Sequence, residues 1–226
     1  MPGQILLDDE WHSLNFVIGR PFFSLFFAQG EGANAIPQNI YSGLLLQTLG
    51  GSELLLRMPS LLLGLLALIV FPPLVEKAFN RVVAVVFAYL LAFSPVLTFY
   101  SRLCRPYAAV CFFGFLSFLF MVLWLRRGKA AFLYGYAFSG FIAMYHHLYA
   151  AVPVLTPLLC LSLLKLLPPG RRPAMKSAQM PSTRMMMRAA AILIVLGTVF
   201  ILPPQLQNPW WQRIVGVGGF DIPKFV

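Results

Sequence analysis

The chain has 226 residues, of which 59% are hydrophobic and only 11% are charged, and its net charge is +10. A soluble globular protein carries about 25% charged residues, so this chain lacks the polar groups that would cover a water-facing surface. The composition, with a mean hydropathy of +0.79, therefore excludes a soluble domain and predicts an all-α fold, a polytopic transmembrane helical bundle.

The first 53 residues are expected to form a loop outside the membrane. The chain begins Met-Pro-Gly-Gln, without a basic segment leading into an apolar run, so no cleavable signal peptide is expected. Three adjacent acids, Asp8, Asp9 and Glu10, repel one another, which can suit one of them to general-base catalysis. A solvated acidic tail is the simpler interpretation of the spacing alone. The apolar stretch 40–49 is too short to cross a membrane and is expected to be a short interfacial helix.

Six spans are predicted in the bundle, which occupies residues 54–204. The stretch 130–167 has one lysine and no other charge, and as a single helix it would be about 57 Å long, nearly twice the hydrocarbon thickness. We therefore expect it to fold back at His146-His147. The predicted spans are 54–75, 82–100, 106–125, 131–145, 148–167 and 189–204. Residues 205–226 are expected to be a tail outside the membrane.

The basic residues distinguish the two sides of this topology. One side receives eleven of the seventeen, and the positive-inside rule places that side in the cytoplasm. Both termini then face out, and 168–188 is a cytoplasmic loop. Because the basic residues lie between apolar runs, nucleic acid is not expected as a partner. The cytoplasmic group is Lys77, Arg81, Arg126, Arg127, Lys129, Lys165, Arg171, Arg172, Lys176, Arg184 and Arg188, and the outer group is Arg20, Arg57, Arg102, Arg105, Arg213 and Lys224.

Two further polar clusters fall on the outer side. Arg102 and Arg105 lie three residues apart, so on a helical turn they would share a face, where two guanidinium groups could hold a lipid phosphate. Snorkelling to the interface is the alternative, although outer arginines run against the positive-inside bias. His146-His147 could ligate a metal, bind a phosphate or hydrogen-bond a loop, and the last is the simplest interpretation. The three cysteines show no metal-ligand spacing.

The order of these motifs resembles one family of membrane enzymes. The motifs are Asp9-Glu10, then Ser52-Glu53-x3-Arg57-Met58-Pro59-Ser60-x3-Gly64, then Tyr100-Ser101-Arg102-x2-Arg105-Pro106-Tyr107, then histidine at the end of a later span. This pattern resembles polytopic glycosyltransferases of the GT-C fold, in particular bacterial relatives of the protein O-mannosyltransferases and of the lipid A aminoarabinose transferase. The resemblance covers about two thirds of the chain, residues 7–154.

The resemblance implies inverting sugar transfer on the outer face of the bacterial inner membrane. The donor would be a polyprenyl-phosphate sugar, and the acceptor a glycan, a lipid or a protein. Asp9, beside Glu10, matches the catalytic position and would act as general base. The donor phosphate would be bound by Arg102, Arg105, Tyr107 and His147. His147 could also contact a divalent metal, the one cofactor that the resemblance allows.

The sequence also departs from the family pattern. Leu103 stands where the family has an acid in the outer loop, His146-His147 replaces Thr-His, and the span expected before Asp-Glu is absent. The chain is also shorter than the family's usual length, so a truncated, non-catalytic membrane module that binds lipid phosphate or scaffolds a partner is the alternative. A small-solute transporter is disfavoured because the polar groups crowd one end of the spans rather than their middle.

Overall fold

The computed structural model describes residues 8–27, 35–168 and 182–206. Every regular element in these ranges is a helix, so the all-α prediction is confirmed for them. The elements are α1 (Asp8–Val17), the 3₁₀ helix η1 (Phe22–Phe26), α2 (Ile36–Thr48), α3 (Glu53–Ala78), α4 (Arg81–Ala92), α5 (Pro95–Tyr100), α6 (Tyr107–Arg127), α7 (Ala130–His146), the 3₁₀ turn η2 (Leu148–Ala150), α8 (Ala151–Leu166), α9 (Thr183–Leu196), the π-helical turn η5 (Gly197–Ile201) and α10 (Leu202–Leu206).

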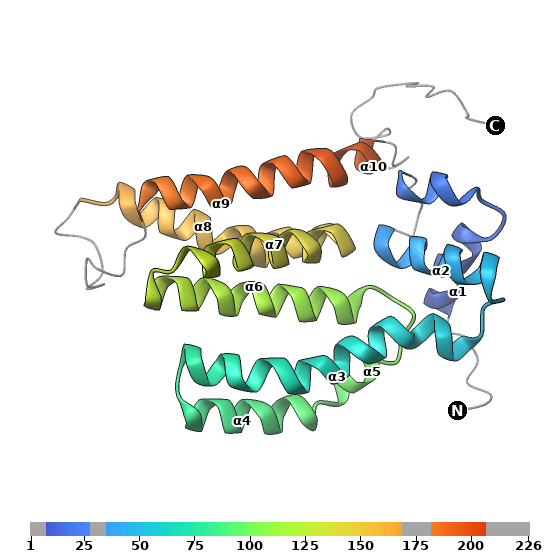
Figure 1. Ribbon diagram of the computed structural model, residues 1–226, viewed down its shortest axis with the longest axis horizontal. Coiled ribbons are helices and arrows are strands. Elements are labelled where there is room, and N and C mark those ends of the chain that lie inside the picture. Colours follow the sequence, from blue (N-terminus) through green and yellow to red (C-terminus); the bar gives the residue numbers. More distant parts are fainter. Residues whose placement is uncertain (1–7, 28–34, 169–181, 207–226) are drawn as a thin grey trace.

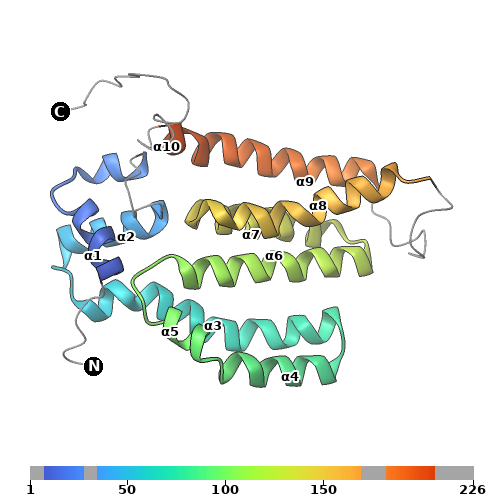
Figure 2. The same cartoon turned by 180° about the vertical axis from the view of Figure 1, so that it is seen from behind.

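The long helices run along a common direction, and the short N-terminal helices lie across one end of them. Figures 1 and 2 show α1, η1 and α2 at this end, which we call the capped end, together with the α5–α6 and α7–α8 connections. The α3–α4 and α6–α7 turns lie at the opposite end, which we call the basic end. The bundle therefore has two chemically separate ends joined by apolar helices.

Four helical stretches have the length and apolar composition to cross a membrane. They are Glu53–Ala78, Tyr107–Arg127, Leu148–Leu166 and Thr183–Leu206. The other two predicted spans correspond to helices that are shorter, α4 with 12 residues and α7 with 17 residues. The described part of the chain therefore supports a multi-pass membrane protein, with four rather than six helices that meet this length.

The predicted span 82–100 is broken into α4 and α5. Pro95 has no backbone N–H to continue a helix and disfavours the helical conformation at the residue before it. Ser94 is accordingly extended, with φ −72° and ψ 113°, and its side chain caps the next helix by accepting a hydrogen bond from the N–H of Leu97. The chain therefore turns within this segment instead of forming one continuous helix.

Helix α7 lies in the largest hydrophobic core of the described residues, packed with α6, α8 and α9. Leu133, Tyr136 and Ala137 are fully buried, and a Cβ added at Gly140 would lie 2.6 Å from a methyl group of Val154. Small residues allow such close approach between membrane helices. The predicted reversal at His146-His147 is confirmed, because α7 ends at His146 and η2 begins at Leu148.

Charge divides between the two ends of the bundle. Among the described residues, eight basic side chains belong to the basic end: Lys77, Arg81, Arg126, Arg127, Lys129, Lys165, Arg184 and Arg188. Four belong to the capped end: Arg20, Arg57, Arg102 and Arg105. The predicted asymmetry is thus retained in three dimensions for the part of the chain that is described, while Arg171, Arg172, Lys176, Arg213 and Lys224 lie outside it.

Candidate functional site

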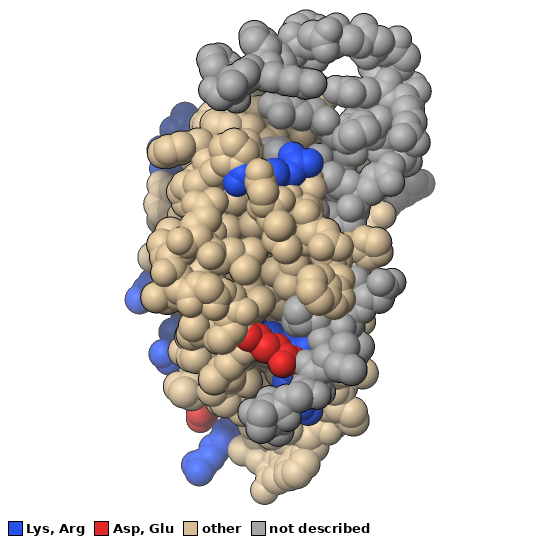
Figure 3. Space-filling model, turned by 90° about the vertical axis from the view of Figure 1, so that its right-hand side faces the viewer, with Lys and Arg blue, Asp and Glu red and all other residues tan. Residues whose placement is uncertain are grey.

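An ion pair fastens helix α1 to helix α3 at the capped end. The carboxylate of Glu10 is completely buried and accepts hydrogen bonds from Arg57 Nε at 2.9 Å and Nη2 at 2.7 Å. Arg57 also lies 2.7 Å from Glu53 Oε1, one helical turn before it. Such two-point pairing is the strong form of an arginine–carboxylate contact. Figure 3, which views this end, shows acidic atoms directly against basic ones on a largely uncharged face.

Glu10 also contacts the third of the ordered motifs, residues 100–107. Its Oε1 accepts a hydrogen bond of 2.6 Å from the backbone N–H of Cys104. Arg57 and Cys104, which Glu10 thus joins to α1, lie 47 and 94 residues further along the chain. Because its oxygens are engaged in this way, Glu10 is suited to fixing the position of α1 rather than to accepting a proton.

The predicted base, Asp9, precedes Glu10 within α1. The side chains of Asp8 and Asp9 lie outside the described residues, so the structure places the backbone of Asp9 and no more. That backbone belongs to the turn of α1 which Glu10 holds against residue 104. Asp9 therefore lies beside the motif that carries the two arginines.

Arg102 and Arg105 do not share a helical face, in contrast to the prediction. Residues 101–106 form no helix between α5 and α6, so a spacing of three residues does not place the two side chains on one helical face. Arg102 is exposed, whereas Arg105 is 8% exposed. The intervening Leu103, at the family's acidic position, is buried. The two arginines of the predicted phosphate site thus differ, since one is exposed and the other is buried.

Arg105 forms a cluster with α1 and with the start of α6. Its Nη1 donates a hydrogen bond to Ser13 Oγ of α1, and its guanidinium lies 5.6 Å from the ring centre of Tyr107. Its carbonyl accepts a hydrogen bond of 3.2 Å from Ser60 in α3. Three helices therefore converge on this residue, and the Tyr107 ring lies within the range of a cation–π contact with its guanidinium.

His147 lies near enough to Arg105 to be affected by its charge, whereas His146 makes its contacts elsewhere. Burial, reinforced by the positive charge of Arg105, lowers the pKa of His147, so its imidazole is neutral at pH 7. Its Nδ1 accepts a 3.4 Å hydrogen bond from the N–H of Tyr149. His146 instead places Nδ1 2.9 Å from the carbonyl of Ile142 and stacks on Phe113. Among the described residues, no group of three or more His, Cys, Asp or Glu side chains is arranged to hold a metal ion.

A set of polar residues that was not predicted from the sequence surrounds Cys104. Gln38 Nε2 of α2 donates to the buried Cys104 sulfur at 3.3 Å, and Ser42 Oγ lies 4.0 Å from it. Burial raises the pKa of this thiol. Gln38 and Ser42 are four residues apart in α2. That spacing places both on one face of a helix, and it was the signal available in the sequence. The helix predicted at 40–49 is α2, and this face anchors it to the site.

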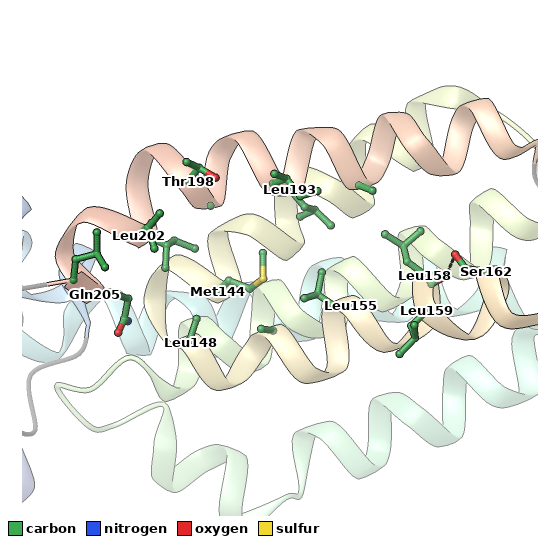
Figure 4. Close-up of a pocket in the computed structure, with 16 residues that line it drawn as sticks. Met144, Leu148, Leu155, Leu158, Leu159, Ser162, Leu193, Thr198, Leu202 and Gln205 are labelled. Carbon is green, nitrogen blue, oxygen red and sulfur yellow. Dashed lines mark hydrogen bonds between the residues drawn. The ribbon is translucent and has the colours of Figure 1, made fainter. Parts of the chain in front are cut away.

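Two apolar hollows run along the bundle from the capped end. A groove of about 1040 Å³ runs between α8 and the α9–α10 stretch, over Met144 of α7 (Figure 4). We call it the α8–α9 groove, and it is lined by residues including Leu148, Leu155, Leu159, Leu193, Thr198 and Gln205. A second hollow, the α3–α6 cavity, has about 520 Å³ and is formed by residues of α3, α4, α5 and α6 with Arg102 on its wall.

Comparison with known protein families, with curated proteins and with solved structures finds no match. The resemblance described above therefore rests on the ordered motifs of the chain.

Proposed function

We propose that the chain is an inverting glycosyltransferase of the GT-C type, which moves a sugar from a polyprenyl-phosphate donor to an acceptor glycan, lipid or protein. The observation that carries the proposal is the contact among the three motifs. Glu10 of the first motif is hydrogen-bonded to Arg57 of the second and to the Cys104 backbone of the third. Residues that were related only by order along the chain thus share one end of the bundle.

The orientation of the site follows from charge. With the basic end in the cytoplasm, as the positive-inside rule favours, the capped end faces the outer side of a bacterial inner membrane. A lipid-linked sugar displayed there would meet Asp9, Arg105 and His147 at the membrane surface.

In the proposed reaction, Asp9 accepts the proton of an acceptor hydroxyl or amine. The acceptor atom forms a bond to C1 of the sugar as the bond from C1 to the phosphate oxygen breaks, and polyprenyl phosphate leaves with the electron pair. A single displacement of this kind inverts C1. Arg105 stabilises the charge that develops on the phosphate, with Tyr107 and neutral His147 beside it. A divalent metal at His147, if one is bound, would add to this charge stabilisation.

The α8–α9 groove suits the long hydrocarbon chain of such a donor. It extends along η2 and α8 from Leu148 to Ser162, which is about 21 Å at 1.5 Å per residue. This exceeds the depth of one bilayer leaflet, about 15 Å. A hydrogen bond of 3.0 Å from Lys165 to Thr183 bridges α8 and α9 toward the basic end. At the capped end the groove begins at Leu148, directly after His147.

The test is transfer of radiolabelled sugar from a panel of polyprenyl-phosphate sugars by the full chain in liposomes. Asp9→Asn should lower the rate by about 10²- to 10⁴-fold, the usual contribution of a general base. Asp8→Asn is the matched control, because it removes the same charge from the neighbouring position. Equal rates for Asp9→Asn and the wild-type chain would refute the assignment of the base.

A second function is favoured by Leu103. This apolar side chain, 7% exposed, occupies the position of the family's outer-loop acid, and a chain without that acid could bind the donor without reacting. Saturable donor binding without turnover, both in the wild-type chain and in Leu103→Glu, would identify a non-catalytic module that holds lipid phosphate or a partner protein.

A further inference from the structure

The α3–α6 cavity has a polar mouth and an aromatic floor. Thr98, Tyr100, Ser101 and Arg102 line it where α5 ends, and most of its other lining is apolar. Phe71, Phe87 and Phe115 also line it, and their rings form a continuous cluster with centroids 5.0 to 6.5 Å apart. The lining therefore changes from cationic and hydroxyl groups to hydrocarbon along the direction of the bundle.

The break between α4 and α5 is what places these groups at the cavity. Ser101 packs so closely on α3 that a Cβ added at Gly64 would lie 2.6 Å from the Ser101 Cβ. The backbone N–H of Arg102 donates to the carbonyl of Phe99 at 3.0 Å, and Ser101 Oγ donates to the carbonyl of Thr98 at 2.8 Å. The mouth is thus held by local hydrogen bonds, and it requires a glycine on the facing helix.

The dimensions of the cavity match one leaflet of a bilayer. Along α3 the lining extends from Leu61 to Phe71, which is about 15 Å, half of the hydrocarbon thickness of about 30 Å. The α8–α9 groove, by comparison, is about 21 Å long. An acyl chain that reaches from the head-group region to the middle of the bilayer therefore fits the α3–α6 cavity, whereas a long isoprenoid does not.

We propose that the α3–α6 cavity is a binding site for an anionic glycerophospholipid, with one acyl chain between α3, α4 and α6 and the head-group phosphate at Arg102. Charge complementarity supports the anionic head, since arginine pairs with phosphate in a planar fork. This site is separate from the Arg105 cluster and is independent of sugar transfer.

Two cysteines provide the test within one chain. Cys111 is exposed and lines the cavity, while Cys160 is exposed on α8 and lines neither hollow. The full chain is placed in nanodiscs of phosphatidylcholine, with or without phosphatidylglycerol. Alkylation of each cysteine by N-ethylmaleimide is then followed by peptide mass spectrometry. Phosphatidylglycerol should slow the reaction of Cys111 relative to Cys160 by about fivefold, the effect expected of one basic residue beside an anionic lipid.

Arg102→Gln should remove this protection and leave the Cys160 rate unchanged, and high salt should weaken it in the wild-type chain. Three results would overturn the proposal. They are equal protection of Cys111 in phosphatidylcholine alone, protection that persists in Arg102→Gln, and protection that only added polyprenyl phosphate produces. The last result would instead identify the cavity as an isoprenoid site.

Discussion

Removal of the Glu10 charge should open the capped end of the bundle. In Glu10→Gln, the amide can still accept the hydrogen bond from the Cys104 N–H, but it no longer neutralises Arg57. Removing one member of a buried ion pair costs about 3–5 kcal/mol. Here Arg57 keeps Glu53 at 2.7 Å and is 12% exposed, so water and the second carboxylate recover part of that loss. We expect about 2 kcal/mol, which corresponds to about a 30-fold increase in the population with α1 detached.

The thiol of Cys104 reports this opening directly. It is 0% exposed, and burial raises its pKa, so it should react with a maleimide only when α1 and α2 move away. Its alkylation in the full chain, followed by mass spectrometry, should accelerate about 30-fold in Glu10→Gln. The control is Glu76→Gln, which removes an exposed carboxylate at the basic end. An unchanged Cys104 rate in Glu10→Gln would show that the ion pair does not hold the helices together.

Three further predictions concern the contacts around the site. Gly64→Ala should lower the free energy of unfolding by about 1–3 kcal/mol, because the new Cβ would overlap Ser101. Gly114→Ala is the control, because a Cβ added there meets nothing within 4 Å, and it should not lower the free energy of unfolding. Thermal unfolding in detergent measures both variants. Since the pKa of His147 is lowered in the folded chain, its contribution to stability should be lost as the pH falls below about 6.5, where the unfolded chain takes up the proton. Arg105→Gln should raise the His147 pKa in an NMR titration, and an unchanged value would exclude a charge effect.

The part of the fold that the sequence predicted follows from length and charge. The reversal at His146-His147 was predictable because an apolar run of that length cannot remain one helix inside a membrane. The division of charge between the ends was predictable because basic residues cluster between apolar segments. The break at Ser94-Pro95 was visible in the residues, but the predicted span 82–100 continued through Pro95, where α5 begins.

The contacts of the site depend on packing that no local pattern contains. The pairing of Glu10 with Arg57, the exposure of Arg102 and the burial of Arg105 arise from how α1 and α2 lie on the bundle. The Arg102–Arg105 spacing was misleading because residues 101–106 are not helical. The polar face of α2 around Gln38 had a signal in its spacing, which became interpretable only when Cys104 was found opposite it.

The hydrogen bonds of Glu10 also fix an order of events during biosynthesis. Its carboxylate is synthesised before Arg57 and the Cys104 N–H, which follow 47 and 94 residues later. Helix α1 is therefore synthesised before α3, α4 and α5, and until they have been translated its Glu10 carboxylate lacks these two hydrogen bonds. The capped end can close only when the chain has passed residue 104, so synthesis that stalls earlier would leave the acidic motif exposed to proteases.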